Sequence, residues 1–192
     1  RAEHRASTLR RLSDAAVDVF ERSGTTATVD DIAATAGLSR RTVFRWVATK
    51  EELAFVHPVL WLDVFDEATE QLATAPMADR VIGGGRAIAH FIDADPEPAR
   101  RAFTVALEYP DLASGFTTVF GRWGDRISTE TLRGIETPTE TERFHARIIG
   151  SAVMGVIDAT TREWVTGGGE ATFSEIYERA IPLVSPLLEY TA

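Results

Sequence analysis

Hydrophobic residues recur along most of the chain at intervals of three and four positions, which is the spacing of one face of an α-helix. The first such stripe predicts a helix over residues 7–23 and contains Leu9, Leu12, Ala16, Val19 and Phe20. Further stripes predict helices over residues 49–72, 78–93, 95–108, 111–135 and 139–165, and a last helix from Phe173. No strand pattern accompanies them, so we expect an all-α fold of about nine helices.

Near the N-terminus the stripes are shorter and are separated by turn residues. Thr28 followed by Asp31 resembles a capping box, which predicts a helix over residues 29–36. Gly37 is expected to end this helix, because glycine readily takes the left-handed conformation of a tight turn. Ser39 is expected to cap a second helix. Two short helices joined in this way predict a helix-turn-helix, whose second helix enters the major groove of DNA.

The second helix of this pair has two distinct faces. Val43 and Val47 are four residues apart and are expected to face inward. The opposite face then contains Arg40, Arg41, Phe44 and Arg45. Arginine clusters on short helix pairs are often only solvated surface, so this pattern alone leaves DNA binding open.

The distribution of charge favours DNA binding. Residues 1–50 contain nine basic and six acidic side chains, whereas residues 51–192 contain eleven basic and twenty-three acidic ones. A protein with a net charge of −9 has therefore concentrated its positive charge in the segment that contains the predicted helix-turn-helix. Attraction to phosphate requires such a local excess, whatever the overall charge.

The chain contains the motif T-V-D-D-I-A-x-x-A-G-L-S-x-x-T-V-F-x-W-V-x-x-K-E-E-L, which resembles the DNA-binding signature of the TetR family of bacterial repressors. The similar segment covers residues 9–53. The resemblance implies an all-α homodimer. Its helix-turn-helix domain would cover residues 1–48, and residues 49–192 would bind a small effector and form the dimer. The segment ending at residues 164–169 resembles the C-terminal half of actinobacterial regulators of the mycofactocin-regulator type.

The resemblance also implies which side chains contact DNA. The residues expected at the DNA backbone are Thr28, Ser39, Thr42, Trp46 and Lys50. Base edges or phosphates are expected opposite Arg40, Arg41, Phe44 and Arg45. Phe44 stands where tyrosine is frequent and so lacks a hydroxyl that could bond phosphate. Trp46 stands where tyrosine or histidine is usual, and its indole N–H can still donate.

Thr49 with Glu52 forms another capping-box pattern, which predicts a long helix reaching Leu72. Lys50 then lies in the first helical turn, where a cation is unfavourable for the helix dipole. It is the only lysine beside nineteen arginines, which favours a phosphate-facing role over a chance surface position. Pro58 is expected to bend the helix. The bend could transmit effector binding or be a plain kink, and the pattern leaves both readings open.

The predicted C-terminal domain is rich in aromatic residues. It can draw on fourteen of the seventeen in the chain. Aromatic residues at helical spacing are more often core, but a helical domain with so many can enclose a ligand cavity. We expect a site for an apolar or aromatic small molecule bounded by Trp61, Phe91, Phe120, Trp123 and Asp158.

The predicted helix over residues 139–165 contains the small residues Gly150, Ser151, Ala152 and Gly155, which permit close helix approach. Together with the last helix it is the expected dimer surface, and the resemblance implies a four-helix bundle with the symmetry mates. The expected interface residues are Phe144, Ile148, Ala152 and Gly155. Alternatively, the small residues serve contacts within one subunit.

Several classes of chemistry are not supported by the sequence. There is no cysteine, which excludes disulfides, thiolate nucleophiles and thiolate metal sites. The four histidines show no metal-ligand spacing, and no serine-centred elbow or phosphate loop is present. We therefore expect no enzyme activity, no metal and no cofactor. No apolar run approaches ~20 residues and no signal-like segment begins the chain, so no membrane association and a cytoplasmic location are expected.

The function predicted from these features is a ligand-responsive transcriptional regulator, specifically a repressor. It would bind a near-palindromic operator in double-stranded DNA as a homodimer, and an apolar or aromatic small-molecule effector would release it. The alternative is a helical small-molecule-binding protein or enzyme that does not bind DNA. The retained basic face and Lys50 argue against that alternative.

Overall fold

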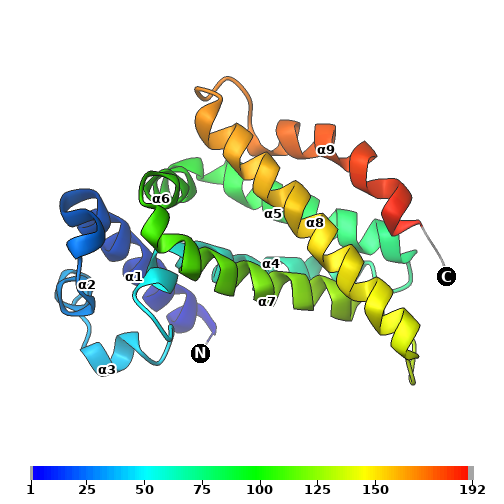
Figure 1. Ribbon diagram of the computed structural model, residues 1–192, viewed down its shortest axis with the longest axis horizontal. Helices are drawn as coiled ribbons and strands as arrows, with labels where there is room; N and C mark the ends of the chain where they lie inside the picture. Colours follow the sequence, from blue (N-terminus) through cyan, green and yellow to red (C-terminus); the bar gives the residue numbers. More distant parts are fainter. Residues whose placement is uncertain (1, 190–192) are drawn as a thin grey trace. The chain divides into compact units, whose positions relative to one another are not determined.

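The structure is a computed structural model that describes residues 2–189, with the backbone alone described at residues 2–6, 54, 56–59, 113, 114 and 116 (Figure 1). The described residues form nine α-helices and three short 3₁₀-helices: α1 (Ala2–Ser23), η1 (Gly24–Thr26), α2 (Val29–Ala36), α3 (Arg40–Val43), η2 (Glu51–Phe55), α4 (Val56–Gln71), α5 (Met77–Ala94), α6 (Pro96–Glu108), η3 (Pro110–Leu112), α7 (Ala113–Thr131), α8 (Glu140–Thr166) and α9 (Phe173–Leu188). The prediction of an all-α fold with about nine helices is confirmed.

The chain forms two compact units. The N-terminal unit consists of Arg1–Trp61 and Asp95–Val119, and the C-terminal unit consists of Leu62–Ala94 and Phe120–Ala192. Of the three boundaries, two fall inside α4 and α7, so both helices contribute to each unit, and the third falls between α5 and α6. These units are defined by how compactly the chain packs, whereas the predicted domain boundary after residue 48 separates DNA binding from effector binding. That functional boundary stays a prediction.

Local signals account for the start and end of α2. The Thr28 hydroxyl accepts a hydrogen bond from the Asp31 N–H at 3.2 Å, and the Asp31 carboxylate accepts from the Thr28 N–H at 3.1 Å. The hydrogen bonds from Thr28 also hold the pKa of Asp31 below its ordinary value. Gly37 follows in the left-handed conformation, with φ 63° and ψ 37°. Arg11 of α1 donates to the Ala36 carbonyl at 2.5 Å, which satisfies an acceptor at the C-terminal end of α2.

The core of the N-terminal unit is built on α1, which begins five residues before the predicted start. Its buried apolar side chains include Leu9, Leu12, Ala16, Val19 and Phe20, as the stripe predicts. Helix α6 joins the same unit by packing on α1. There the Arg101 guanidinium donates to Asp18 at 2.8 Å and to Glu21 at 2.6 Å.

The segment after the helix-turn-helix differs from the prediction. The Glu52 N–H donates to the Thr49 hydroxyl at 3.4 Å, but a 3₁₀-helix follows and the α-helix begins only at Val56. This tighter turn lets Glu52, Leu53 and Phe55 all be buried. Pro58 therefore lies in the first turn of α4, where its missing N–H removes no intrahelical bond. The predicted bend at Pro58 inside one long α-helix from Thr49 is wrong, because the irregular 3₁₀ part precedes α4 and Pro58 lies in its first turn.

Three consecutive glycines on α5 leave room for side chains of neighbouring segments to lie against the backbone of this helix. A Cβ atom added to Gly83 would lie 2.4 Å from the side chain of Leu72, in the turn after α4, and one added to Gly84 would lie 2.5 Å from the ring of Phe65 on α4. A Cβ atom on Gly85 would lie 2.0 Å from the hydroxyl of Tyr177 on α9. Side chains from α4, from the turn after it and from α9 therefore lie against the α5 backbone, and α5 packs on α9.

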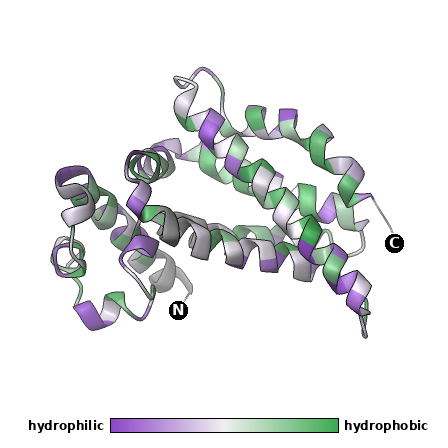
Figure 2. Cartoon of the chain, viewed as in Figure 1, coloured by the Kyte–Doolittle hydropathy of each residue, from purple (hydrophilic) through white to green (hydrophobic). Residues whose placement is uncertain are grey.

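Polar contacts also fix α9 against α5. The Asp93 carboxylate accepts hydrogen bonds from the backbone N–H groups of Phe173 at 2.8 Å and Ser174 at 3.1 Å. It therefore supplements the capping box that Thr172 forms with Glu175. Helix α9 also packs against α8. Figure 2 shows hydrophobic and hydrophilic residues alternating along α8 and α9.

Helices α4 and α7 are joined within the C-terminal unit by several contacts. The rings of Phe65 and Trp123 meet edge to face, with centroids 5.6 Å apart, and Asp66 pairs with Arg126 at 2.6 Å. Helix α7 ends at Thr131, four residues before the predicted end, and Gly134 follows with φ 90°.

Over the described residues, no helix combines the length and the apolar character needed to cross a membrane.

Candidate nucleic-acid interface

The second helix of the pair is short and is extended by turns. The Ser39 hydroxyl caps α3 by accepting from the Thr42 N–H at 3.1 Å. Beyond Val43, the backbone N–H groups of Trp46 and Val47 both donate to the Val43 carbonyl, at 2.9 and 3.3 Å. This continued helical path keeps Val43 and Val47 buried on one face, as predicted.

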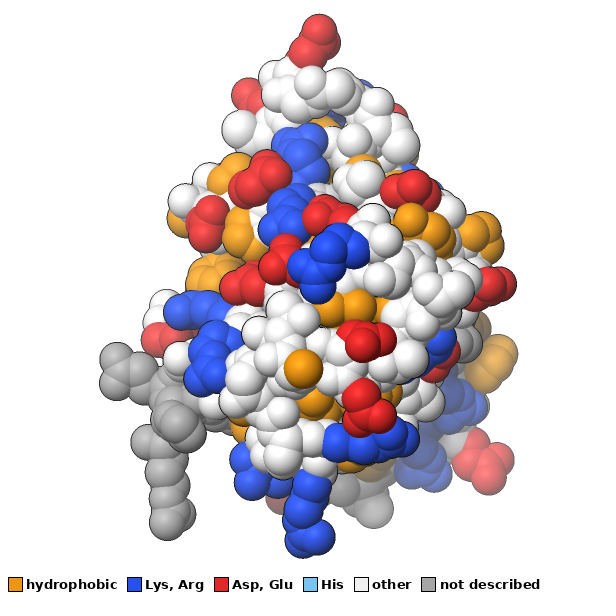
Figure 3. Space-filling model, turned by 90° about the vertical axis from the view of Figure 1, so that its left-hand side faces the viewer, with side chains coloured by type: hydrophobic (Ala, Val, Ile, Leu, Met, Phe, Trp, Pro, Cys, Tyr) orange, Lys and Arg blue, Asp and Glu red, His pale blue; other side chains and the backbone are white. Residues whose placement is uncertain are grey.

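The opposite face of α3 is exposed, which agrees with the predicted set of Arg40, Arg41, Phe44 and Arg45. Phe44 is 43% exposed, a large value for an aromatic side chain. The Arg40 guanidinium lies 5.4 Å from the centroid of the Phe44 ring, in the geometry of a cation–π contact. Figure 3 shows Lys and Arg side chains along the lower part of the face that includes this region, with acidic groups between them.

Arg40 also has an acidic partner on the preceding helix. Its Nη1 donates to Asp30 Oδ2 at 2.8 Å, and both side chains remain well exposed. The pattern of residues did not predict this pair, because it joins positions ten apart across the turn at Gly37.

Trp46 presents a polar group that lacks a partner. Its indole Nε1 is buried and has no hydrogen-bond acceptor among the described atoms, and the Arg45 guanidinium lies 5.5 Å from its ring centroid. A buried N–H without an acceptor costs free energy.

Lys50 has a role that the sequence did not indicate. Its Nζ donates to the backbone carbonyl of Thr25 at 2.8 Å and to that of Ala27 at 3.2 Å. The side chain thereby ties the segment after α3 to the turn before α2. The ammonium group has three N–H donors, so one remains for a phosphate.

The hydroxyls expected at the DNA backbone lie at the starts of the two helices. Thr28 caps α2 and Ser39 caps α3, while the Thr42 and Ser39 hydroxyls are 2.9 Å apart. The N-terminus of a helix attracts anions through its free N–H groups and its dipole. The cap residues of the sequence pattern and the basic face of α3 are thus brought together in one small region of the N-terminal unit.

The residues predicted to bound an effector site belong to both units. Trp61 is buried in the N-terminal unit, with its ring centroid 5.8 Å from that of Phe103 on α6. The other four lie in the C-terminal unit, where Trp123 is buried, Phe120 is half-buried and Phe91 is 39% exposed. Asp158 accepts from Arg162 at 2.9 Å, an i, i+4 pair on α8. A common pocket for these five residues stays a prediction.

The predicted dimer residues share one side of α8. Phe144 and Ile148 are 53% and 42% exposed, and a Cβ atom on Gly155 would meet no atom within 4 Å. Ala152 is half-buried. On α9, Leu183 is 80% exposed.

The small residues of α8 divide between two roles. A Cβ atom on Gly150 would lie 2.4 Å from the Gly124 carbonyl oxygen and 2.5 Å from the Ser128 hydroxyl, both on α7. Gly150 therefore serves a contact within the subunit, whereas Gly155 faces open space. The reading of a contact within one subunit therefore holds for Gly150, and a dimer contact at Gly155 stays a prediction.

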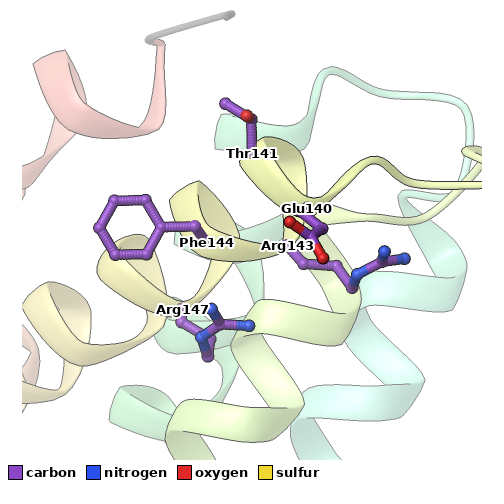
Figure 4. Close-up of a pocket in the computed structure, with 5 residues that line it drawn as sticks. All are labelled: Glu140, Thr141, Arg143, Phe144 and Arg147. Carbon is purple, nitrogen blue, oxygen red and sulfur yellow. The ribbon is translucent and has the colours of Figure 1, made fainter.

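A shallow, open depression lies at the start of α8 (Figure 4). It is lined by Glu140, Thr141, Arg143, Phe144 and Arg147. None of the five residues predicted to bind the effector lines it. In the described part of the chain, no cluster of three or more His, Asp or Glu side chains is arranged to hold a metal ion.

Comparison with known proteins adds to this geometry. Residues 12–55 match the family model for bacterial regulatory proteins of the tetR family. The chain is 25% identical over 166 residues to a Mycobacterium tuberculosis protein named as the mycofactocin biosynthesis transcriptional regulator MftR, with 84% of this chain and 81% of that protein covered. The predicted similarity to regulators of that type is therefore confirmed.

Two solved structures have a similar fold. The fatty acid degradation regulator FadR from Bacillus halodurans has a TM-score of 0.60 at 16% identity, with 96% of this chain and 97% of that chain covered. Thermus thermophilus FadR, a TetR-family transcriptional repressor in complex with lauroyl-CoA, has a TM-score of 0.59 at 18% identity, with 96% of each chain covered.

The helix-turn-helix and its exposed basic face define an all-helical DNA-binding protein. Residues 12–55 match the DNA-binding domain of the TetR family of bacterial regulatory proteins, and the chain is similar over most of its length to a transcriptional regulator.

Proposed function

We propose that this regulator is a repressor that binds a near-palindromic operator as a homodimer and is released by a small apolar or aromatic effector. The observation that carries the proposal is the exposed basic face formed by Arg40, Arg41 and Arg45, where Arg40 also bonds Asp30 in the first turn of α2. An arginine side chain can donate two hydrogen bonds to one guanine, at O6 and N7, and the N-terminus of a helix attracts phosphate.

The proposed DNA contacts divide into two groups. Base edges and nearby phosphates would be contacted by Arg40, Arg41, Phe44 and Arg45. The DNA backbone would be contacted by Thr28, Ser39, Thr42, Trp46 and Lys50.

The exposed stripe on α8 supports the homodimer. Phe144 and Ile148 are large apolar side chains exposed to solvent in one protomer, and Gly155 leaves room for a close helix crossing. On α9, Leu183 is another large apolar side chain exposed to solvent. A two-fold dimer presents two reading helices related by symmetry, so the operator should be a near-palindrome with half-sites roughly 34–36 Å apart.

The aromatic content of the chain supports an apolar or aromatic effector, held by Trp61, Phe91, Phe120, Trp123 and Asp158. Thermus thermophilus FadR is in complex with lauroyl-CoA, a ligand whose long acyl chain is apolar. An effector releases DNA only if it prefers the conformation that binds the operator poorly. Coupling of ~1–3 kcal/mol is typical for such systems and would weaken operator affinity ~5–150-fold.

Selection of bound duplexes from a random pool, followed by titration of the enriched sequence, tests operator binding. Arg41→Ala should relax base preference and weaken binding by ~1–3 kcal/mol if Arg41 contacts a base through two donors. A helical ligand-binding protein that does not bind DNA would enrich no sequence.

A thermal-shift screen of acyl thioesters and aromatic metabolites tests the effector, with Trp61 and Trp123 as fluorescence reporters. Reciprocity requires operator DNA to weaken ligand binding by the same factor by which the ligand weakens operator binding. A ligand that stabilises the protein yet leaves operator affinity unchanged would contradict the proposed release.

A further inference from the structure

Arg40 is held on the exposed face of α3 by two neighbours. Its Nη1 donates to the Asp30 carboxylate at 2.8 Å, and its guanidinium carbon lies 5.4 Å from the Phe44 ring centroid. Asp30 belongs to the first turn of α2, and Arg40 is the first residue of α3. The Asp30 and Arg40 side chains are 65% and 60% exposed, so the pair bridges the two helices on their solvent side.

The two acidic residues in the first turn of α2 have different partners. Asp31 closes the capping box with Thr28, and its carboxylate faces the backbone of its own helix. Asp30 is not needed for that cap, and it reaches the next helix instead. A negative charge beside a DNA-reading helix weakens the attraction to phosphate. Asp30 therefore opposes general DNA binding, and its contribution must come through Arg40.

The bond to Asp30 determines which donors of Arg40 are presented outward. It engages Nη1 and leaves the edge formed by Nε and Nη2. That edge has two N–H donors side by side, which match the O6 and N7 acceptors of guanine in the major groove. The Phe44 ring beside the guanidinium restricts its rotation, which reduces the entropy lost when the contact forms.

We propose that Asp30 is a specificity-determining residue that orients Arg40 toward a guanine in each operator half-site. The inference rests on the proposed operator binding. In the free protein the ion pair is weak, because both partners are exposed. It strengthens when DNA excludes water from the interface, since Coulomb attraction increases as the local dielectric falls. Without Asp30, the Arg40 side chain is free to turn to a phosphate, which contains no sequence information.

The test compares base preferences of the full-length protein and its variants by selection from a random duplex pool and by titration of single-base operator variants. Arg40→Ala should lower the preference for guanine at one position of each half-site ~5–150-fold. Asp30→Asn should lower the preference at that same position by up to about fivefold, the limit for an exposed ion pair. Binding of Asp30→Asn to random-sequence duplex should become tighter, because one negative charge is removed.

Asp31→Asn is the matched control. It removes the same charge one residue away and keeps an oxygen that can accept from the Thr28 N–H. It should also bind random duplex more tightly, with base preference unchanged. Unchanged guanine preference in Asp30→Asn or in Arg40→Ala, or an equal loss in Asp31→Asn, would overturn the role of Asp30 while operator binding stands. A wild-type protein that enriches no sequence would overturn operator binding and this inference together.

Discussion

Gly85 of α5 faces Tyr177 of α9 so closely that a Cβ atom on Gly85 would lie 2.0 Å from the tyrosine hydroxyl oxygen. The same hydroxyl donates to the Ile82 carbonyl at 3.3 Å, one turn earlier on α5. Burial of the phenol raises the pKa of Tyr177 well above its ordinary value, so the hydroxyl keeps its proton and remains a donor. The close approach of α5 and α9 thus depends on the absence of a side chain at Gly85 and on the buried hydroxyl donor of Tyr177.

Gly85→Ala should destabilise the protein by ~1–3 kcal/mol, because the added methyl group forces Tyr177 or the α9 backbone to move. Ordinarily alanine stabilises a helix interior relative to glycine by ~0.5–1 kcal/mol. Gly121→Ala on α7 is the control, because its added Cβ atom would meet no atom within 4 Å. Urea unfolding of the two variants should therefore give shifts of opposite sign. Equal stabilisation of both would contradict the close packing at Gly85.

The ion pair between Arg86 on α5 and Glu178 on α9 should make stability depend on acid pH. The hydrogen bond from Arg86, at 2.6 Å, holds the pKa of Glu178 below its ordinary value. Such a group stabilises the fold at pH values above its unfolded pKa of ~4.3, and the contribution is lost as pH falls through the lower folded pKa. Glu178→Gln should therefore lose less stability than the wild type between ~pH 5 and pH 3.

Urea unfolding at a series of pH values measures this difference. Glu170→Gln, on the exposed loop before α9, removes the same charge and should keep the wild-type dependence on pH. The effect is expected to be small, because both partners of the ion pair are 49% exposed. Parallel curves for the wild type and Glu178→Gln would show that the pair does not contribute.

Lys50→Met should affect both folding and DNA binding. Loss of the hydrogen bonds to Thr25 and Ala27 should lower stability by ~1 kcal/mol. If the ammonium also contacts a phosphate, binding to every duplex should weaken and the slope of log affinity against log salt should shrink by ~0.9. Arg179→Met on α9 is a charge control and should leave that slope unchanged. Lower stability with a wild-type slope would restrict Lys50 to bracing the turn before α2.

Gly155→Leu should favour monomers, because a bulky side chain on the exposed face of α8 prevents the close helix crossing proposed for the dimer. Sedimentation velocity over a range of concentrations measures the shift. Gly121→Leu places the same side chain on an equally open position of α7 and should leave the dimer intact. Gly150→Ala should instead lower the stability of each subunit, because the added methyl group meets the α7 backbone. An intact Gly155→Leu dimer would place the interface elsewhere.

The helix-turn-helix could be predicted from sequence because its signals act over three or four residues. Thr28, Asp31, Gly37 and Ser39 each stop or start a helix through their own hydrogen bonds or backbone conformation, and the structure shows each in its expected role. The exposed face of α3 follows from helical periodicity once Val43 is known to face inward. The ends of helices depend less on local signals. Over residues 51–55 a 3₁₀-helix forms in place of the predicted α-helix, because burial of Glu52, Leu53 and Phe55 outweighs the capping signal at Thr49.

The sequence by itself therefore determined the all-helical class, the helix-turn-helix and the resemblance of the N-terminal segment to the TetR family. Only the tertiary structure decided which of several chemically equal residues face each other. Gly150 packs on α7 while Gly155 faces open space, and Asp30 bonds Arg40 while Asp31 caps its own helix. Such choices depend on the direction in which side chains far apart in the chain meet, and neither residue type nor helical spacing contains that information.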